Sequence, residues 1–590
     1  MNIFKFFGKR DWIFSFLVLG LIVFQVWLDL ELPEYMNQMT VMIQSGVCTT
    51  GDIAIIGLKM LGISLAISIL SVIIGYFVAV ISATMGKRMR SGVFQKVQGF
   101  GHNEVSKFSI PSLITRSTND ITQIQMTVAM GLEVLLRAPI LSIWAITTIL
   151  GKSWELSLAT AGAVLILVVL VVVIVVFALP KFKKIQTYTD NLNRVTRENV
   201  SGLRVIRAHN AEDYQSKKFA KANNDVTNTN LSVNRLMALL SPGMTLMTSG
   251  LSLAIYWIGA YLLNSTAVTT VGDPSRIVIF GDIMVFMQYS MMIVMSFVML
   301  TMIFIMLPRA IVSAKRVGEV LDTPNIVQFP ANTQLDPKAD TTYSVEFKNV
   351  SFRYPGATDY VLKDISFTAK PGETIAFIGS TGSGKSTLIN LIPRFYDATQ
   401  GEILINGQNI RNYSKNDLMN LMSYVSQKAF LFDDTILNNV TFGDSGKEKS
   451  PDVVKSALTI SQSLPFVQNM PAGVDSHISE GGQNVSGGQK QRLSIARALA
   501  REPQIILFDD SFSALDYQTD KTLRDALRTN LAHSTMLIVA QRIGTIMDAD
   551  TIIVLDQGNM VGAGKHADLL KNCPIYREIA LSQLSEEELN

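Results

Sequence analysis

Six long apolar runs fill the first half of the chain, and they constrain its fold more than any other feature. Each run comes near or exceeds the about 20 residues that a helix needs to cross the hydrocarbon core of a bilayer. The runs cover residues 12–30, 53–83, 128–150, 154–179, 238–263 and 278–307. They predict six transmembrane helices, several of which are long enough to continue as intracellular extensions.

The composition agrees with a membrane protein and argues against other classes. Hydrophobic residues make up 48% of the 590 residues and charged residues only 17%, which is little charge for a soluble chain of this length. The formal net charge of +3 gives no reason to expect nucleic-acid binding. Cys48 and Cys573 offer no disulfide framework, and the five histidines show no metal-ligand spacing.

Basic residues predict the orientation of the spans. The start, MNIFKFFGKRDW, is basic and is followed by no small-residue cleavage site, so the first run is interpreted as a retained span. Residues 87–116 and 181–235 are rich in Lys and Arg, whereas Asp29, Glu31 and Glu34 follow the first run. We therefore expect a multi-pass protein of the cell membrane with both termini in the cytoplasm.

The sequence changes character after Leu307. A helix leaving the membrane completes a transmembrane domain at residues 1–322, and a polar, proline-containing linker follows at 323–342. Short apolar strands then alternate with amphipathic helices over residues 343–590. This pattern predicts an α/β domain with a largely parallel core sheet.

A phosphate-binding loop is predicted at the start of this α/β domain. The apolar strand TIAFIG runs into GSTGSGKS and then into a helix. Glycines let backbone N–H groups point at phosphate oxygens, Lys385 reaches the β/γ-phosphates, and Ser386 is suited to ligate Mg²⁺. The residues expected to hold ATP here are Gly379, Ser380, Thr381, Gly382, Ser383, Gly384, Lys385, Ser386 and Thr387.

Two further motifs follow in order. NVSGGQKQRLSIARAL begins a helix that can read a second phosphate group, and the apolar strand IILFD ends on an acid shortly before SALD. With GSTGSGKS, these motifs resemble those of ATP-binding cassette transporters. Together with the six preceding spans, the whole chain is similar to an exporter half-transporter of that family, with an α-helical membrane domain followed by an α/β nucleotide-binding domain.

The resemblance implies roles for particular residues. Tyr354 matches the aromatic residue that stacks on adenine, while Gln427 and Asp509 match the residues that contact Mg²⁺ together with Ser386. Asp516 matches an acid in a loop that crosses to the other subunit, and Glu480 lies where exporters place a loop that touches intracellular helices. In the family two cassettes pack head to tail, so each ATP is held between the two subunits. The binding site for the partner's ATP would therefore be completed by Ser486, Gly487, Gly488 and Gln489.

Two positions depart from the family pattern. Asp510 stands where the family usually has a glutamate that polarises the attacking water, and Gln541 stands where it has a histidine that contacts the γ-phosphate. A carboxylate withdrawn by about 1 Å can cost about 10²-fold in rate, and an amide cannot become cationic or relay a proton. We expect this site to bind ATP and hydrolyse it weakly.

The signature VSGGQ, by contrast, is regular. The chain therefore resembles the degenerate-site subunit of bacterial heterodimeric multidrug exporters, which are ATPase-coupled translocases. This resemblance implies a partner half-transporter that carries Glu and His in its own catalytic site, with hydrophobic or amphiphilic small molecules as substrates. A lipid or peptide exporter remains the nearest alternative, and an ATP-gated channel or regulator is the alternative from a different class.

The membrane half contains three further candidates. Intracellular stretches 109–121 and 197–212 resemble coupling elements. Glu133 and Arg137, four residues apart, are expected either to pair with each other or to form a cavity-facing site for cationic substrates. The last span places methionines on one helical face, which suits either packing or contact with greasy substrates. These methionines are Met284, Met287, Met291, Met295, Met299, Met302 and Met306.

Overall fold

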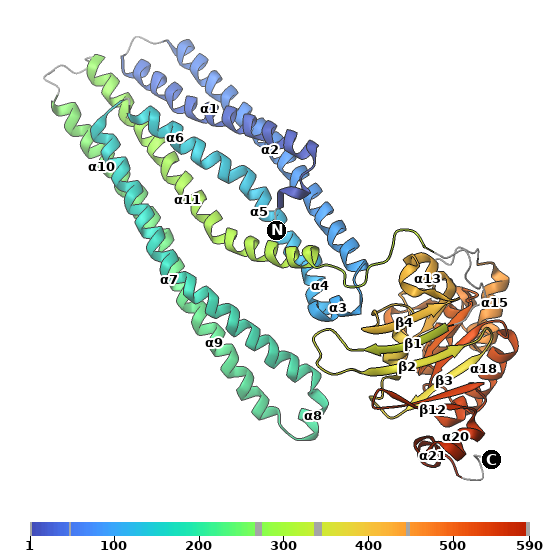
Figure 1. Ribbon diagram of the computed structural model, residues 1–590. Helices are drawn as coiled ribbons and strands as arrows, with labels where there is room; N and C mark the ends of the chain where they lie inside the picture. The colour runs from blue at the N-terminus through green and yellow to red at the C-terminus, as the bar shows by residue number, and fades with distance from the viewer. Residues whose placement is uncertain are drawn as a thin grey trace. The chain divides into compact units, whose positions relative to one another are not determined.

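Figure 1 shows a computed structural model of the protein, which describes residues 3–45, 49–150, 152–265, 274–334, 345–443 and 449–585. The chain divides into two compact units. The membrane unit contains Met1–Gln98 and Ile110–Thr323, and the nucleotide unit contains Gly99–Ser109 and Pro324–Asn590.

The membrane unit is built from helices alone within the described residues. They are η1 (Ile3–Phe6), α1 (Lys9–Ser45), α2 (Thr50–Gln98), α4 (Ile110–Ser117), α5 (Asn119–Met130), the π-helical turn η2 (Gly131–Leu135), α6 (Leu136–Leu150), α7 (Trp154–Ser201), α8 (Leu203–Ala208), α9 (Glu212–Ala238), α10 (Leu240–Ser265) and α11 (Pro274–Asp322). Six helical stretches in the described part are long and apolar enough to cross a membrane, and the six predicted spans fall on them, so this prediction is confirmed.

The last helix, α11, organises the membrane unit. It packs against α1, α5, α6, α7 and α10. Its fully buried Phe286 and Val285 belong to one apolar core with Ile22 of α1 and Ile255 of α10. In Figure 1, α7 and α9 run side by side and α8 lies at the turn between them, so the predicted stretch 197–212 forms this turn.

The acids expected after the first span lie on a helix instead. Because α1 continues to Ser45, the side chains of Asp29 and Glu34 are carried by the span itself. Asp29 accepts a hydrogen bond from Arg137 of α6 at 2.8 Å. The expected pair between Glu133 and Arg137 is therefore wrong. Between α6 and α7, Lys152 pairs with Glu34 at 3.2 Å and with Asp282 at 3.1 Å.

The nucleotide unit contains one helix from the first half of the chain, α3 (His102–Phe108). Its strands are β1 (Val345–Phe352), β2 (Leu362–Ala369), β3 (Thr374–Gly379), β4 (Gln400–Ile405), β5 (Gln408–Asn409), β6 (Met422–Val425), β7 (Asp434–Thr435), β8 (His477–Ile478), β9 (Ile505–Asp509), β10 (Thr535–Val539), β11 (Thr551–Asp556) and β12 (Asn559–Gly564). Its other helices are α12 (Lys385–Leu391), η3 (Ile410–Asn412), α13 (Lys415–Leu421), α14 (Ile436–Val440), α15 (Pro451–Ile460), α16 (Leu464–Gln468), η4 (Gly473–Asp475), η5 (Glu480–Gly482), α17 (Gly487–Leu499), α18 (Tyr517–Asn530), α19 (Ile543–Ile546), α20 (His566–Asn572) and α21 (Pro574–Leu581).

The core sheet is largely parallel, as predicted. Its order is β12-β11-β3-β10-β9-β6, and only β12 runs antiparallel to its neighbour. Strand β9 is buried along its whole length, which agrees with its continuous apolar sequence, because parallel strands are covered on both faces. A smaller antiparallel sheet, β2-β1-β4-β5, adds a second layer of core through Phe347 and Ile405.

The segment that packs with the nucleotide unit precedes the predicted coupling stretch 109–121. Buried Glu104 of α3 accepts hydrogen bonds from the backbone N–H groups of Gly101 at 2.8 Å and Ile326 at 2.9 Å. The His102 ring lies edge-on to Tyr396, with ring centroids 6.1 Å apart. Residues 110–121 instead form α4 and the start of α5 in the membrane unit.

The first part of the predicted linker 323–342 is fixed to the nucleotide unit. Arg394 donates to the carbonyl of Gln328 at 2.9 Å and lies over the ring of Phe329. The N–H of Gln334 donates to the carbonyl of Asn412 at 2.8 Å. Residues 335–342, and residues 343–344 of the predicted domain, lie outside the described residues.

Asp120 joins the start of α5 to the C-terminal part of α11, which generates the first prediction. Its buried carboxylate accepts from the Ser313 hydroxyl at 2.9 Å and lies 3.4 Å from Arg316. We expect Asp120→Ala to lower stability by about 1–3 kcal/mol, since hydrogen bonds to charged groups contribute about that much. The measurement is the melting temperature of the full chain in detergent. Asp190→Ala, at an exposed carboxylate of α7, is the control, and equal melting temperatures for the two variants would contradict the prediction.

Candidate functional site

The predicted phosphate loop lies between β3 and α12. Gly382 and Gly384 have φ angles of +86° and +99°, which favour glycine because it lacks a Cβ. A Cβ on Gly384 would come within 2.7 Å of the Leu362 side chain, and one on Gly379 within 2.0 Å of the Leu555 carbonyl oxygen. The sequence thus folds into a close backbone curl whose N–H groups precede a helix, the arrangement that suits phosphate.

Lys385 is folded back over this loop. Its ammonium group donates to the carbonyl oxygens of Gly379 at 2.8 Å and Ser380 at 2.7 Å, and lies 3.3 Å from the Ser383 hydroxyl. Burial lowers the pKa of Lys385, while the nearby carboxylates of Asp510 and Asp509 oppose that shift. A cation held by neutral oxygens beside a curl of N–H groups fits the phosphates of a nucleotide.

Ser386 and Asp509 are brought together as the metal prediction requires. The Ser386 hydroxyl donates to one oxygen of Asp509 at 2.7 Å, and the Tyr424 hydroxyl donates to the other at 3.0 Å. In the described part of the chain, no group of three or more His, Cys, Asp or Glu side chains could hold a metal by itself. This donor set fits Mg²⁺, which binds through one or two carboxylates plus substrate phosphates and would neutralise phosphate charge.

Asp510 is held by two amides. One oxygen, Oδ2, accepts from Gln541 Nε2 at 2.8 Å and from Gln427 Nε2 at 3.1 Å. The residue is only 6% exposed and has a φ of +48°. Burial raises the pKa of its carboxyl, and the hydrogen bond from Gln427 opposes that rise. The two residues that depart from the family pattern therefore interact directly, and Asp510 also accepts from the glutamine expected to contact Mg²⁺.

Tyr354 lies at the side of the loop where adenine is expected. Its hydroxyl is 2.9 Å from the Thr387 hydroxyl of α12. Its ring packs edge-on against Phe352 and Tyr396, with centroids 4.9 Å and 5.2 Å away. Burial raises the pKa of Tyr396 to about 12, so this hydroxyl stays neutral at physiological pH. The Tyr354 ring itself is half-buried and is held in a fixed orientation.

The signature residues form a helix start of their own. Ser486 caps α17: its N–H donates to the Gln489 side chain at 2.9 Å, and its hydroxyl accepts from the Gln489 N–H at 3.3 Å. A Cβ on Gly487 would meet nothing within 4 Å. Among the described residues, these side chains share no hydrogen bond with the phosphate loop. The chain thus has two helix N-termini suited to bind phosphate, and within the described residues no hydrogen bond connects them.

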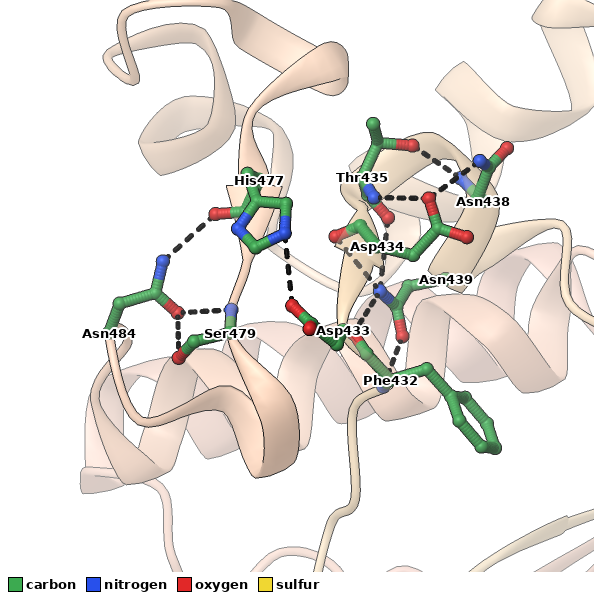
Figure 2. Close-up of polar contacts among 9 residues, drawn as sticks. All are labelled: Phe432, Asp433, Asp434, Thr435, Asn438, Asn439, His477, Ser479 and Asn484. Atoms are coloured by element: carbon green, nitrogen blue, oxygen red, sulfur yellow. Dashed lines mark hydrogen bonds and ion pairs between the residues drawn. The ribbon is translucent and has the colours of Figure 1, made fainter.

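The segment after Gln427 is tied to the loop that precedes the signature (Figure 2). Strand β7 pairs with β8, and Asp433 lies 3.0 Å from His477. The Asn439 side chain accepts from the N–H of Phe432 at 2.9 Å and donates to its carbonyl at 3.0 Å. On the other side, Asn484 donates to the carbonyl of His477 at 2.9 Å. Exposed Glu480 lies at the start of η5, between His477 and Asn484 in the sequence.

Arg497 fastens the signature helix to the same segment. Its guanidinium donates to the carbonyls of Asn439 and Phe430, both at 2.8 Å, and to the Asn439 side chain at 2.7 Å. It also lies over the rings of Phe432 and Phe442. Burial lowers the pKa of Arg497 to about 10, so the side chain remains charged at neutral pH.

The methionines of the last span do not share one environment. Met291, Met295 and Met299 are exposed at 36%, 52% and 46%, respectively. Met284 is half-buried, and half-buried Met287 packs against the apolar core of the membrane unit. The predicted stripe therefore has an exposed row in its middle, formed by Met291, Met295 and Met299, and half-buried ends at Met284, Met287 and Met306. The side chain of Met302 lies outside the described part of the structure.

Sequence reasoning missed Tyr424, Tyr396 and Arg497. Tyr424 carries a usable signal, because it stands three residues before Gln427 on β6, and β6 runs parallel to the strand that ends at Asp509. The other two depend on contacts between segments that no local pattern reveals. Asp516, in contrast, has a local structural role as the cap of α18, where it accepts from the Thr519 N–H at 3.0 Å.

Comparison with known families gives two matches. Residues 15–297 match the ABC transporter transmembrane region, and residues 362–513 match the ABC transporter family. The chain is 38% identical over 540 residues to an uncharacterized ABC transporter ATP-binding protein of Mycobacterium tuberculosis, covering 90% of each chain. It is 31% identical over 504 residues to the ATP-dependent lipid A-core flippase of Pseudomonas fluorescens, covering 85% of this chain and 81% of that protein.

A solved structure shares the fold. The structure of a bacterial Atm1-family ABC exporter with ATP bound matches with a TM-score of 0.78 and 24% sequence identity. The match covers 98% of this chain and 99% of that chain. The six spans followed by an α/β nucleotide-binding domain are therefore confirmed as one known architecture.

The buried carboxylate of Asp510 generates a prediction on pH-dependent stability. The pKa of Asp510 is raised in the folded chain. Its contribution to folding stability is therefore fully present below the ordinary pKa of 3.8 and is lost as the pH rises through the pKa of the folded state. At neutral pH the ionised group then costs stability. Asp510→Asn should raise the melting temperature of the nucleotide-free full chain by about 2–4 °C near neutral pH.

The gain in melting temperature should shrink as the pH is lowered toward the ordinary pKa of 3.8, because the wild-type carboxyl takes up its proton above that pH. Asp525→Asn, at an exposed position of α18, removes the same charge without the burial and serves as the control. A gain that is independent of pH, or an equal gain in the control, would contradict the assignment.

Proposed function

This chain belongs to the ATP-binding cassette transporter family, and from that premise we propose that it is one half of a heterodimeric exporter. Its own phosphate-loop site holds ATP and hydrolyses it poorly, while its signature loop completes the competent site of a partner half. The matched transmembrane and nucleotide-binding regions support the half-transporter organisation. The single observation that supports weak hydrolysis is that the side-chain amides of Gln427 and Gln541 both donate hydrogen bonds to Asp510 Oδ2.

Asp510 is limited both in its reach and in its ability to accept a proton. A general base must lie within hydrogen-bond distance of the water whose proton it takes. The Asp510 carboxylate is one methylene shorter than the usual glutamate, and one of its two oxygens already accepts from two amides. Gln541 can donate to a phosphate oxygen, but it cannot carry a proton or a charge. The side chains that bind nucleotide remain in place, so binding is retained while water activation is weakened.

ATP and Mg²⁺ are the cofactors that this site would take. Gly379 to Thr387 would hold the phosphates, and the Tyr354 ring would lie against adenine. Ser386, Asp509 and Gln427 would hold Mg²⁺, with Tyr424 orienting Asp509. Since Gln427 donates to Asp510 through Nε2, its amide oxygen would remain available to contact Mg²⁺.

The intact signature supports the heterodimer. Ser486, Gly487, Gly488 and Gln489 have no role at this chain's own phosphate loop within the described structure, yet Ser486 and Gln489 form a well-ordered capping box. A homodimer would carry Asp510 and Gln541 in both sites. A partner that brings Glu and His would make one competent site, which this signature loop completes, and hydrolysis there would reset the transport cycle.

Hydrophobic or amphiphilic small molecules are the proposed substrates. The exposed row of Met291, Met295 and Met299 offers soft, adaptable side chains on the last span. A lipid substrate is the nearest alternative, because one relative is named a lipid A-core flippase. The basic intracellular segments support a cell membrane location with both termini in the cytoplasm, and the bacterial sources of the relatives support a bacterial membrane.

An ATPase comparison tests the division of labour between the two sites. In the dimer formed with the partner half, Ser486→Arg should lower ATPase activity by about 10²-fold, because it obstructs donors at the competent site. Asp510→Asn should lower it by less than about threefold, because this carboxylate contributes little to water activation. Steady-state phosphate release in reconstituted membranes measures both.

The ATPase activity of the chain purified alone is the measurement that could contradict this proposal. Rapid ATP turnover by a homodimer, abolished by Asp510→Asn, would overturn both the weak site and the need for a partner. Trapping of a photoreactive ATP analogue on Lys385-containing peptides checks separately that the site binds nucleotide.

The methionine row generates a second prediction for transport. Replacing Met291, Met295 and Met299 together by Ala removes the soft exposed surface, so the relative transport of several amphiphilic dyes should change by about threefold or more. Met292→Ala, at a residue packed against the apolar core, is the matched control and should leave the profile unchanged. Flipping of a fluorescent lipid, measured in parallel, distinguishes the lipid alternative, and identical dye profiles would count against the row as a substrate surface.

A further inference from the structure

The charged side chains of the spans are mostly neutralised in pairs, and Glu133 is not. Asp29 pairs with Arg137, and Glu34 and Asp282 share Lys152. Among the described residues, the carboxylate of Glu133 has no hydrogen bond or ion pair. Glu133 precedes the end of α6 at Leu150 by 17 residues, or about 25 Å along a helix. This depth lies within a hydrocarbon core of about 30 Å.

A π-helical turn explains why Glu133 lacks its expected partner. In a regular helix, residues four apart lie on one face and can pair. Glu133 occupies the middle of η2, Gly131–Leu135, where the wider turn inserts an extra residue and rotates the helix that continues beyond it. Arg137 is thereby directed to Asp29 of α1, at 2.8 Å. Glu133 remains on the surface of the membrane unit, where it is exposed.

The surroundings of Glu133 are apolar and soft. Met126 and Met130 lie two turns and one turn before it at helical spacing, and they are 47% and 45% exposed. The turn η2 and helix α5 both pack against α11, whose exposed row contains Met291, Met295 and Met299. Two neighbouring helices thus present thioether side chains and one carboxylate.

An exposed carboxylate at this depth faces either lipid or the path between two halves. An ionised group that faces lipid is costly, by about 2.5–3.5 kcal/mol on insertion scales at the bilayer centre and by less toward the interface, and ionisable groups in spans almost always face the bundle interior or a water-filled cavity. A single negative charge among polarizable apolar side chains complements a molecule that carries one positive charge on a greasy body.

We propose that Glu133 recognises the positive charge of lipophilic organic cations in the transport path, with Met126 and Met130 contacting their apolar bodies. This inference rests on the proposed exporter function and narrows its substrate class. The charge is recognised by the carboxylate itself, since Arg137 is committed to Asp29. A neutral molecule of similar shape would be bound by the methionines alone.

Binding of two matched probes tests the inference. The dimer that the full chain forms is placed in lipid nanodiscs, and equilibrium binding of tetraphenylphosphonium, a fixed cation, is compared with that of uncharged triphenylphosphine oxide. Glu133→Gln should weaken binding of the cation by about tenfold and binding of the neutral probe by less than about twofold. Glu155→Gln, at an acid that accepts from Ser153 at the start of α7, should alter neither.

Each outcome has a defined meaning. Glu133→Asp keeps the charge and should retain cation binding within about threefold of wild type, which separates charge from packing. Equal loss for both probes, loss of cation binding in the Asp and Gln variants alike, or no loss in the Gln variant overturns the inference. Failure of the wild-type dimer to bind either probe also overturns it, while the ATPase comparison continues to test the exporter proposal independently.

Discussion

The parallel register of β3, β6, β9 and β10 is the constraint on which the nucleotide site depends. Parallel strands end at the same edge of a sheet, so the phosphate loop after β3, Gln427 after β6, Asp509 at the end of β9 and Gln541 after β10 converge. Burial on both faces holds this register through continuous apolar sequences. A slip of one residue in β9 would turn Asp509 to the opposite face and separate it from Ser386.

In the membrane unit, the corresponding constraint is the neutralisation of charge. Removing a charged side chain from water is costly unless it is paired, so the helices pack in registers that join Asp29 to Arg137 and Asp120 to Ser313 and Arg316. These contacts connect α1 with α6 and α5 with α11. The π turn η2 changes the register within a single span. One local departure from regular helix geometry therefore decides which acids are neutralised by the protein and which remain available.

The features of the fold and of the site that could be predicted from sequence are those that depend on residues close together in the chain. The six spans, the parallel sheet and the contact between Ser386 and Asp509 follow from apolar length, strand–helix alternation and a loop of fixed spacing. The expected Glu133–Arg137 pair was wrong because it assumed a regular helix. The role of residues 99–109 in the nucleotide unit was not predicted, because the bond from Ile326 to Glu104 joins segments 222 residues apart. The contact of Phe329 with Arg394 likewise joins segments that no local pattern connects.

The hydrogen bonds around Gln427 provide a physical connection from the Asp510 site to the signature loop. Gln427 donates to Asp510 through Nε2, and under the proposed function its amide oxygen would contact Mg²⁺, so occupancy of the site would add a second anchor to the segment after Gln427. That segment is fixed to α17 by Asn439 and Arg497, and α17 begins at Ser486. Under the proposed division of labour, Ser486 serves the partner's ATP. A site that holds nucleotide for long periods would then adjust the competent site, and slow hydrolysis would extend the time over which it does so.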